Sequence, residues 1–144
     1  MHDASTFPAY RGQMEYVCLG CGKRLPMDEL HYTCPVCKGV FLLEDCNFAT
    51  LAETDPAKWR RRFDVRAAAK RPALRGIFRF YELMAPVLEE EDIIYLGEGN
   101  TPIIPAAPAL TRRLNASFAF KNDGQNPSAS FKDRGMACAF SYLK

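Results

Sequence analysis

Two pairs of cysteines give the strongest sign of chemistry in this sequence. Each pair has the form Cys-x-x-Cys and twelve residues separate the pairs, which are Cys18, Cys21, Cys34 and Cys37. Four thiolates on two facing turns suit a tetrahedral zinc ion, and a site closed by four sulfurs is structural rather than catalytic. Iron, an empty site and two disulfides are the alternatives, but nothing in the sequence indicates the oxidising compartment that disulfides need.

A lysine near the C-terminal end carries the second signal. Lys132 follows a loop of small and polar residues and precedes an apolar helical pattern. Ser130 and Asp133 have the spacing of a helix cap and its partner, which predicts that Lys132 lies in the first turn of that helix. The helix start favours a nucleophilic amine and can receive an anion, and Phe131 could supply an apolar wall. An exposed lysine at an ordinary helix start explains this spacing equally well.

The elements that would position these residues fall into three segments. Residues 1–50 show little helical periodicity, which predicts short strands and knuckle-like turns, a zinc-ribbon-like module. Residues 51–92 predict a basic helical linker, with one helix from Asp55–Pro56 to just before Pro72 and a second over 73–84. Residues 93–144 read as α/β, with strands at 93–96 and 118–121 and a final helix beginning near Ser130.

Composition places the chain among ordinary folded proteins and excludes several classes. Hydrophobic residues make up 48% and charged residues 25% of the 144 residues, which argues against disorder. No apolar run approaches the roughly 18 residues of a membrane span, and the first fifteen residues lack the apolar core of a secretory signal. We therefore expect a cytoplasmic protein with no membrane partner.

The net charge of +2 is unevenly distributed. Residues 56–79 contain nine basic residues and one acid, a local charge of +8. Such a segment is found on nucleic-acid-binding faces and also on solvated helices that lie over acidic neighbours. Arg60, Arg61 and Arg62 are consecutive, so they spread around a helix instead of lining one face. We do not expect nucleic acid to be the partner.

Two longer motifs carry a family resemblance. Gly97-Glu-Gly-Asn-Thr-Pro-Ile103, followed by Lys121-Asn-Asp-Gly-Gln-Asn-Pro-Ser-Ala-Ser-Phe-Lys-Asp-Arg-Gly-Met136, closely resembles the N-terminal portion of threonine synthase. That family belongs to the fold-type II pyridoxal-phosphate enzymes, which are related to tryptophan synthase β chains. Some threonine synthases also begin with paired-cysteine knuckles, so the resemblance extends from about Val17 to Lys144.

The resemblance implies a fold and an activity. The fold would be α/β, a fold-type II domain beginning at residue 93 behind the zinc-ribbon-like module and the linker. Lys132 would be the catalytic residue and would carry pyridoxal 5′-phosphate, with Phe131 and Ser130 beside the cofactor. The substrate would be a small molecule, O-phosphohomoserine, converted with water into threonine and phosphate. Three further residues become candidates for binding anionic groups: Lys121, Arg134 and Thr101.

The resemblance also sets limits. Many relatives have Glu and Thr-Gly in the lysine loop, where this chain has Asp123 and Ser128-Ala129. The family's phosphate-binding glycine loop and the groups that face the cofactor ring would follow the lysine helix, so we expect an N-terminal piece that is inactive alone. The alternatives are another fold-type II enzyme (cysteate synthase or threonine dehydratase-like) or a non-enzymatic zinc-ribbon module that binds nucleic acid. The oligomeric state stays open.

Overall fold

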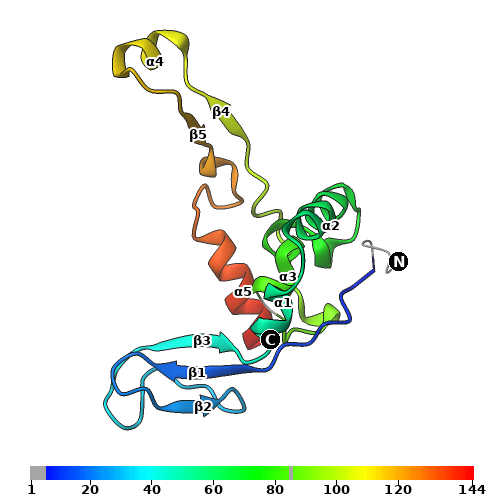
Figure 1. The fold of residues 1–144 in the computed structure, drawn as a ribbon, viewed down its shortest axis with the longest axis vertical. Helices are drawn as coiled ribbons and strands as arrows, with labels where there is room; N and C mark the ends of the chain where they lie inside the picture. The colour runs from blue at the N-terminus through cyan, green and yellow to red at the C-terminus, as the bar shows by residue number, and fades with distance from the viewer. Residues whose placement is uncertain (1–5, 85) are drawn as a thin grey trace.

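The computed structural model describes residues 6–84 and 86–144. Figure 1 shows a small sheet within residues 14–45, a helical body, and an arm formed by residues 103–121 that extends away from the body. This mixture of helices and small sheets confirms the α/β expectation at that coarse level. The pairings within both sheets of the described residues are antiparallel.

The N-terminal sheet has three short strands. They are ordered β2-β1-β3, where β1 is Met14–Cys18, β2 is Arg24–Pro26 and β3 is Phe41–Asp45. Tyr16 lies opposite Leu25 on one side and Leu43 on the other. Its ring is 5% exposed and packs 5.0 Å from Phe41 and 5.6 Å from His31. The predicted short strands and knuckle turns are confirmed, and the residues of this sheet form only a small core.

A strap before β1 ties the sheet to the helical body. Phe7 packs edge-on against Tyr81 with ring centroids 4.8 Å apart. The Arg11 guanidinium donates to the Tyr81 hydroxyl, which itself donates to the Leu88 carbonyl oxygen at 2.8 Å. Tyr81 is fully buried within the apolar core of the body, which also contains Phe78, Leu88 and Ala137.

The first predicted helix forms as expected. α2 spans Pro56–Ala68, and the Asp55 carboxylate caps it by accepting the Ala57 backbone N–H at 2.8 Å. A short helix that the sequence reading missed, α1 (Phe48–Ala52), precedes it. Trp59 of α2 donates its ring N–H to the Leu51 carbonyl, which joins these two helices.

The prediction of one continuous helix over 73–84 is wrong. The segment is divided into 3₁₀ turns at Pro72–Leu74 and Gly76–Phe80, followed by α3 at Tyr81–Met84. The break falls at Gly76, which has a φ of +56°. A Cβ on this residue would lie 2.5 Å from the Glu98 carbonyl oxygen and 2.8 Å from the Tyr95 ring. The apolar spacing of the segment suits a helix, but this close approach requires glycine and a left-handed backbone.

Gly76→Ala is expected to lower the free energy of unfolding by about 2–5 kcal/mol, because left-handed strain and steric overlap add together. Gly22→Ala is the matched control, since Gly22 also has a positive φ, +72°, but nothing lies within 4 Å of its Cβ position. The control should lose only about 1–2 kcal/mol. Urea unfolding of the two variants measures the difference, and equal losses would show that the contact with Glu98 carries no cost.

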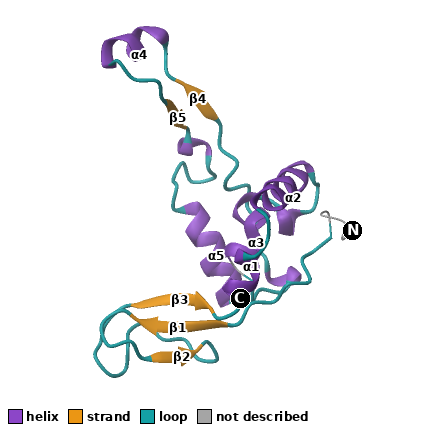
Figure 2. Cartoon of the chain, viewed as in Figure 1, coloured by secondary structure: helices purple, strands orange, loops and turns teal. Residues whose placement is uncertain are grey.

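The arm contains two strands and a helix. β4 (Ile103–Pro105) pairs with β5 (Ala119–Lys121), and α4 (Pro108–Leu114) joins them (Figure 2). The predicted strand at 118–121 is therefore confirmed, whereas β4 and α4 were missed. A lone two-stranded sheet is only marginally stable in water, and both strands of this one are exposed.

The predicted strand at 93–96 is wrong. The segment is extended, but its N–H groups donate to side chains: that of Ile94 to the Ser141 hydroxyl at 2.8 Å and that of Leu96 to the Glu98 carboxylate at 3.0 Å. The bond to Ser141 anchors the segment to α5 (Asp133–Leu143), whose Ala137 enters the body core. No helix among the described residues is long and apolar enough to cross a membrane.

Candidate functional site

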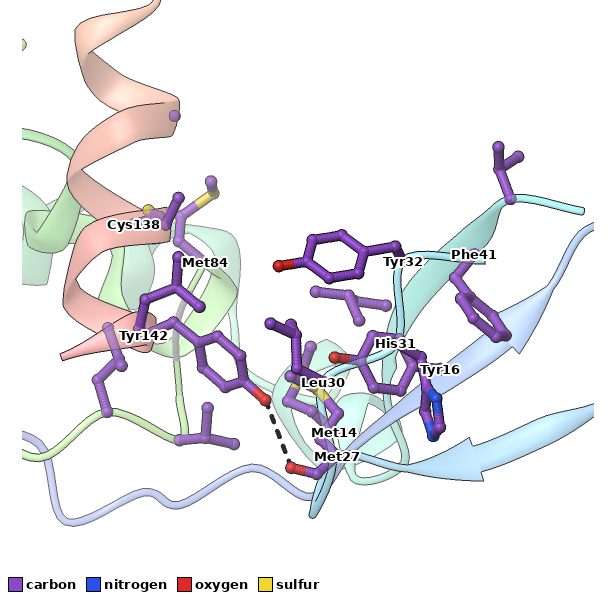
Figure 3. Close-up of a pocket in the computed structure, with 17 residues that line it drawn as sticks. Met14, Tyr16, Met27, Leu30, His31, Tyr32, Phe41, Met84, Cys138 and Tyr142 are labelled. Carbon is purple, nitrogen blue, oxygen red and sulfur yellow. Dashed lines mark hydrogen bonds between the residues drawn. The ribbon is translucent and has the colours of Figure 1, made fainter. Parts of the chain in front are cut away.

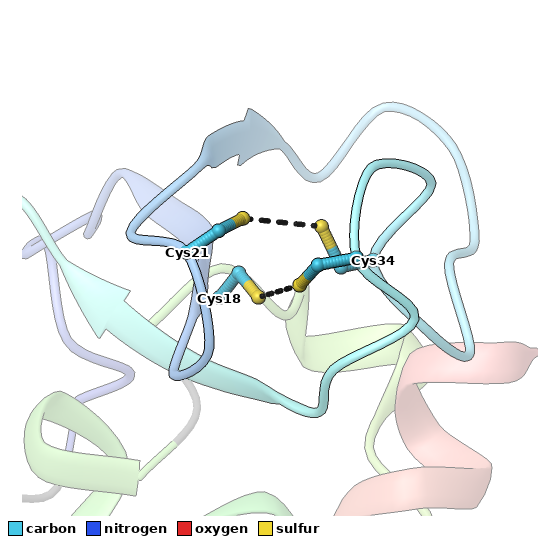
Figure 4. A group of neighbouring side chains, drawn as sticks. Cys18, Cys21 and Cys34 are labelled. Atoms are coloured by element: carbon cyan, nitrogen blue, oxygen red, sulfur yellow. Dashed lines mark hydrogen bonds between the residues drawn. The ribbon is translucent and has the colours of Figure 1, made fainter.

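The four paired cysteines meet at one end of the ribbon sheet. Their sulfur atoms all lie within 4.8 Å of one another, although Cys18 and Cys34 are buried and the other two are exposed (Figure 4). Two sulfur contacts join the knuckles: Cys18 and Cys37 are 3.4 Å apart, and Cys21 and Cys34 are 3.7 Å apart. The structure therefore brings together the whole predicted ligand set in a cluster of the size that a tetrahedral ion needs.

Both knuckles use the same backbone turn. The residue after the second cysteine donates its N–H to the carbonyl of the first: Gly22 to Cys18 and Lys38 to Cys34, each at 2.9 Å. Gly22 and Lys38 both adopt positive φ values, +72° and +61°. The repeated turn directs the two sulfurs of each knuckle toward the same point.

Two glycines make room for the sulfur atoms. A Cβ on Gly20 would lie 3.2 Å from the Cys37 sulfur, and one on Gly39 would lie 3.2 Å from the sulfurs of both Cys18 and Cys37. Gly20 lies inside the first Cys-x-x-Cys unit, and Gly39 follows the second. The Gly20 N–H also points at the Cys18 sulfur, 3.3 Å away. The backbone therefore forms a cradle that fits four thiolates and an ion between them.

The electrostatics of the cluster favour a cation. The Cys21 N–H lowers the pKa of Cys18 to about 6. The Gly39 N–H lowers the pKa of Cys37, but hydrogen bonds with the neighbouring thiols outweigh it and raise that pKa to about 12. One sulfur thus ionises readily and suppresses ionisation of its neighbour, and a bound dication would remove that conflict.

Lys132 lies just before α5, at its cap position and not in its first turn as predicted. Its backbone N–H donates to the Ser130 hydroxyl oxygen at 3.2 Å. The predicted return contact from Asp133 to Ser130 is wrong, because the Asp133 carboxylate accepts the Ser128 N–H at 2.8 Å and the Ser128 hydroxyl instead. The Lys132 and Phe131 side chains are both exposed. The Lys132 amine forms no hydrogen bond or ion pair with the described residues.

The three expected anion binders are instead tied to one another. Arg134 forms a two-pronged ion pair with Asp123, with N···O distances of 2.7 and 2.9 Å. Thr101 donates its hydroxyl to Asp123 at 2.7 Å, and the Lys121 amine donates to the Thr101 carbonyl. These bonds occupy the hydroxyl of Thr101, the amine of Lys121 and much of the Arg134 guanidinium. The three side chains are therefore not available to bind an anionic group. The sequence reading did not assign Asp123 this central position.

Ala129 shows that one departure from the family pattern has a structural cost. Its φ is +58°, in the left-handed region that favours glycine. The family resemblance implies glycine at this position in many relatives, so alanine here is a strained replacement and not only a small one. The Ala129 N–H donates to the Asn126 carbonyl at 2.8 Å, which closes the turn around it.

An apolar cavity lies away from Lys132. It has a volume of about 580 Å³ and opens between the ribbon and the distal part of α5 (Figure 3). Its walls are mainly apolar, with aliphatic side chains beside methionine and aromatic ones that include Met14, Tyr16, Met84 and Tyr142. Tyr142 donates to the Met27 carbonyl at 3.3 Å across it. Lys132 does not line this cavity, so it is not the pocket of the lysine site.

Comparison with curated proteins identifies relatives of one kind. The chain is 44% identical over 72 residues to a threonine synthase of Synechocystis and 43% identical over 70 residues to one of Halalkalibacterium halodurans. These alignments cover 49% of this chain and 19% and 20% of the relatives. A threonine synthase of Methanocaldococcus jannaschii is 36% identical over 121 residues, 83% of this chain.

The chain is similar to threonine synthases over part of its length. It spans only about a fifth to a quarter of the length of these relatives, between 19% and 26%. No protein-family profile matches it. The expected resemblance to threonine synthases is thus confirmed over part of the chain, and the four-cysteine cluster is consistent with the expected zinc-ribbon-like module.

Proposed function

We propose that this chain is the lysine-bearing portion of a pyridoxal-phosphate-dependent lyase of the threonine synthase type. The observation that carries the proposal is the free, exposed amine of Lys132 in a loop that the rest of the structure holds in place. A lysine that forms a covalent bond to a carbonyl cofactor needs such an accessible amine. The homology to threonine synthases supports the same assignment.

The residues around Lys132 fit the cofactor in part. Phe131, 64% exposed, offers an apolar surface beside the amine, and the Ser130 hydroxyl, which already holds the Lys132 N–H, lies at the same loop. Pyridoxal phosphate supplies an electron sink that acidifies carbon–hydrogen bonds of an amino acid. Lys132 would then act as the base that removes a proton from the substrate α-carbon and returns protons at neighbouring carbons.

The proposed overall reaction converts O-phosphohomoserine and water into threonine and phosphate. The residues that hold the cofactor phosphate and face its ring in this enzyme class lie outside the two motifs present here. We therefore propose that the 144-residue chain has no activity by itself. The enzyme to which it belongs would be cytoplasmic and would act on a small-molecule substrate. Cysteate synthase or threonine dehydratase chemistry remains the alternative within the class.

The four-cysteine cluster would hold a structural zinc ion. All four coordinating positions would be filled by sulfur, which leaves none for a substrate. The ion would replace the large core that residues 14–45 lack.

The contacts of the basic segment match a basic helix that lies over acidic neighbours. Four of its arginines pair with acids: Arg62 and Arg66 with Glu82, Arg71 with Glu90, and Arg79 with Asp64. Glu82 and Glu90 lie outside the segment and lower its local charge from +8 to +6, and the pairing directs these arginines toward acids and not toward phosphates.

Reductive trapping tests the assignment of Lys132. The chain is incubated with pyridoxal 5′-phosphate, treated with borohydride and mapped by peptide mass spectrometry. We expect Lys132 to be modified faster than the exposed Lys58, and the Lys132→Arg variant to lose that site alone. Equal modification of all exposed lysines would contradict the proposal. Assay of the protein encoded by the complete reading frame with O-phosphohomoserine then tests the substrate, and phosphate release without threonine would exclude threonine synthase.

A further inference from the structure

The lysine loop and the loop at residues 97–102 are joined through one carboxylate. Asp123 accepts both prongs of the Arg134 guanidinium, at 2.7 and 2.9 Å, and the Thr101 hydroxyl at 2.7 Å. Arg134 also donates to the Thr101 hydroxyl oxygen at 3.1 Å. A two-pronged ion pair fixes direction as well as distance. The three side chains therefore form a triangle, which we call the Asp123 clamp, that joins Thr101 to residues 22 and 33 positions later in the sequence.

A second set of hydrogen bonds holds the same two loops together. The Gly99 N–H donates to the Asn126 side-chain oxygen at 2.9 Å, and the Asn126 amide donates to the Asp123 carbonyl at 2.9 Å. The Asn122 N–H donates to the Pro102 carbonyl at 2.9 Å. Asn126 is 4% exposed and Thr101 is 5% exposed, so both loops are packed where they meet. Asp123 is thus fixed from its backbone and from its side chain.

Both sequence neighbours of Lys132 on its C-terminal side are held by this arrangement. Asp133 binds Ser128, and Arg134 binds Asp123. The Lys132 carbonyl accepts the Met136 N–H at 3.0 Å, which begins α5. The backbone of Lys132 is therefore fixed on both sides while its side chain stays exposed.

We propose that Asp123 is a positioning residue for Lys132, which acts by holding Arg134 and Thr101 and thereby fixes the start of α5 against the 97–102 loop. This inference rests on the proposed function, because it assigns Lys132 a reaction for which its position matters. Asp123 touches neither substrate nor cofactor in this role. Arg134 and Thr101 accordingly act as partners of Asp123 and not as anion-binding groups.

The test compares variants of the whole chain, loaded with zinc. Asp123→Asn keeps the size of the side chain and removes its charge, and Asp123→Glu is the conservative variant that keeps the carboxylate. Asp28→Asn is the matched control, since Asp28 is exposed and forms no ion pair with the described residues. Amide hydrogen exchange is followed over 128–137 and over 14–45, and borohydride trapping with pyridoxal 5′-phosphate gives the ratio of Lys132 to Lys58 modification.

We expect Asp123→Asn to accelerate exchange over 128–137 by about tenfold or more, because charge-assisted hydrogen bonds are lost, with little change over 14–45. The Lys132 to Lys58 trapping ratio should fall in the same variant and recover in Asp123→Glu. Asp28→Asn should change neither measurement.

Two results would overturn the positioning role. One is unchanged exchange over 128–137 in Asp123→Asn. The other is a trapping ratio that exceeds one in the parent chain and does not fall in the variant, since a merely structural residue would affect stability alone. Failure of the proposed function gives a different result: the parent chain would itself modify Lys132 no faster than Lys58, while the exchange data would still decide whether the Asp123 clamp fixes this loop.

Discussion

Removal of zinc from the metal-loaded chain should unfold residues 14–45 and leave the helical body folded. The ribbon buries few apolar groups apart from Tyr16, and its other buried residues are the ligands Cys18 and Cys34. Structural zinc contributes roughly 10–16 kcal/mol in small peptides, more than such a core can supply. The body keeps its own core around Phe78 and Tyr81. Circular dichroism and amide exchange before and after chelation measure the two regions separately.

A pair of cysteine variants provides the control for this prediction. Cys34→Ser removes a fully buried ligand and should abolish zinc binding together with the fold of the ribbon. Cys46→Ser alters an exposed cysteine outside the cluster and should leave both unchanged. Persistence of protected amides over 14–45 after chelation would contradict a metal-dependent fold.

The features that the sequence predicted correctly are those set by local chemistry. Cysteine spacing alone located the four-sulfur cluster, because each Cys-x-x-Cys unit forms its own turn and places two sulfurs on one side of that turn. Asp55 followed by Pro56 located the start of α2, because a cap and a proline act on their immediate neighbours. Neither prediction needed information about distant parts of the chain.

The features that were missed depend on contacts between distant residues. The apolar pattern of 73–84 suits a helix, but the approach of Glu98 to Gly76 breaks it. Residues 93–96 have the composition of a strand. The Ile94 N–H, however, donates to the hydroxyl of Ser141, which lies more than forty positions later. No local pattern records such contacts, so propensity alone gives the wrong element.

The lysine site shows both cases within a few residues. The motif predicted a helix beginning beside Lys132, and α5 begins at the next residue. The capping partner did not follow from the motif, because Asp133 had two acceptable targets and the fold uses Ser128. The role of Asp123 was also invisible, since Arg134 and Thr101 reach it from segments that only the folded chain brings together.

Glu82→Gln is expected to destabilise the helical body by about 3–5 kcal/mol, a large share of the stability of a domain of this size. The Glu82 carboxylate is 2% exposed and binds Arg66, itself 3% exposed, at 2.6 Å. The variant would leave the Arg66 charge buried without its counter-ion. The exposed pair of Arg24 and Glu44 gives the control, because Glu44→Gln should cost only about 0–1 kcal/mol. Urea unfolding measures both, and equal losses would show that burial of the pair has no consequence.

The same pair gives a pH dependence whose direction is fixed. Burial raises the pKa of Glu82, but the hydrogen bonds and charge of Arg66 outweigh burial and lower it below the ordinary value of 4.5. The unfolded chain therefore takes up the proton first, so the pair's contribution is present above that value and is lost as the pH falls below it. The parent chain should lose stability between neutral and acidic pH more steeply than Glu82→Gln.

A double variant, Arg66→Met with Glu82→Leu, should recover much of the stability that Glu82→Gln loses, because a buried pair replaced by apolar groups leaves no charge unpaired. The pair would then fix the orientation of α2 relative to α3 and would not be the main source of the body's stability.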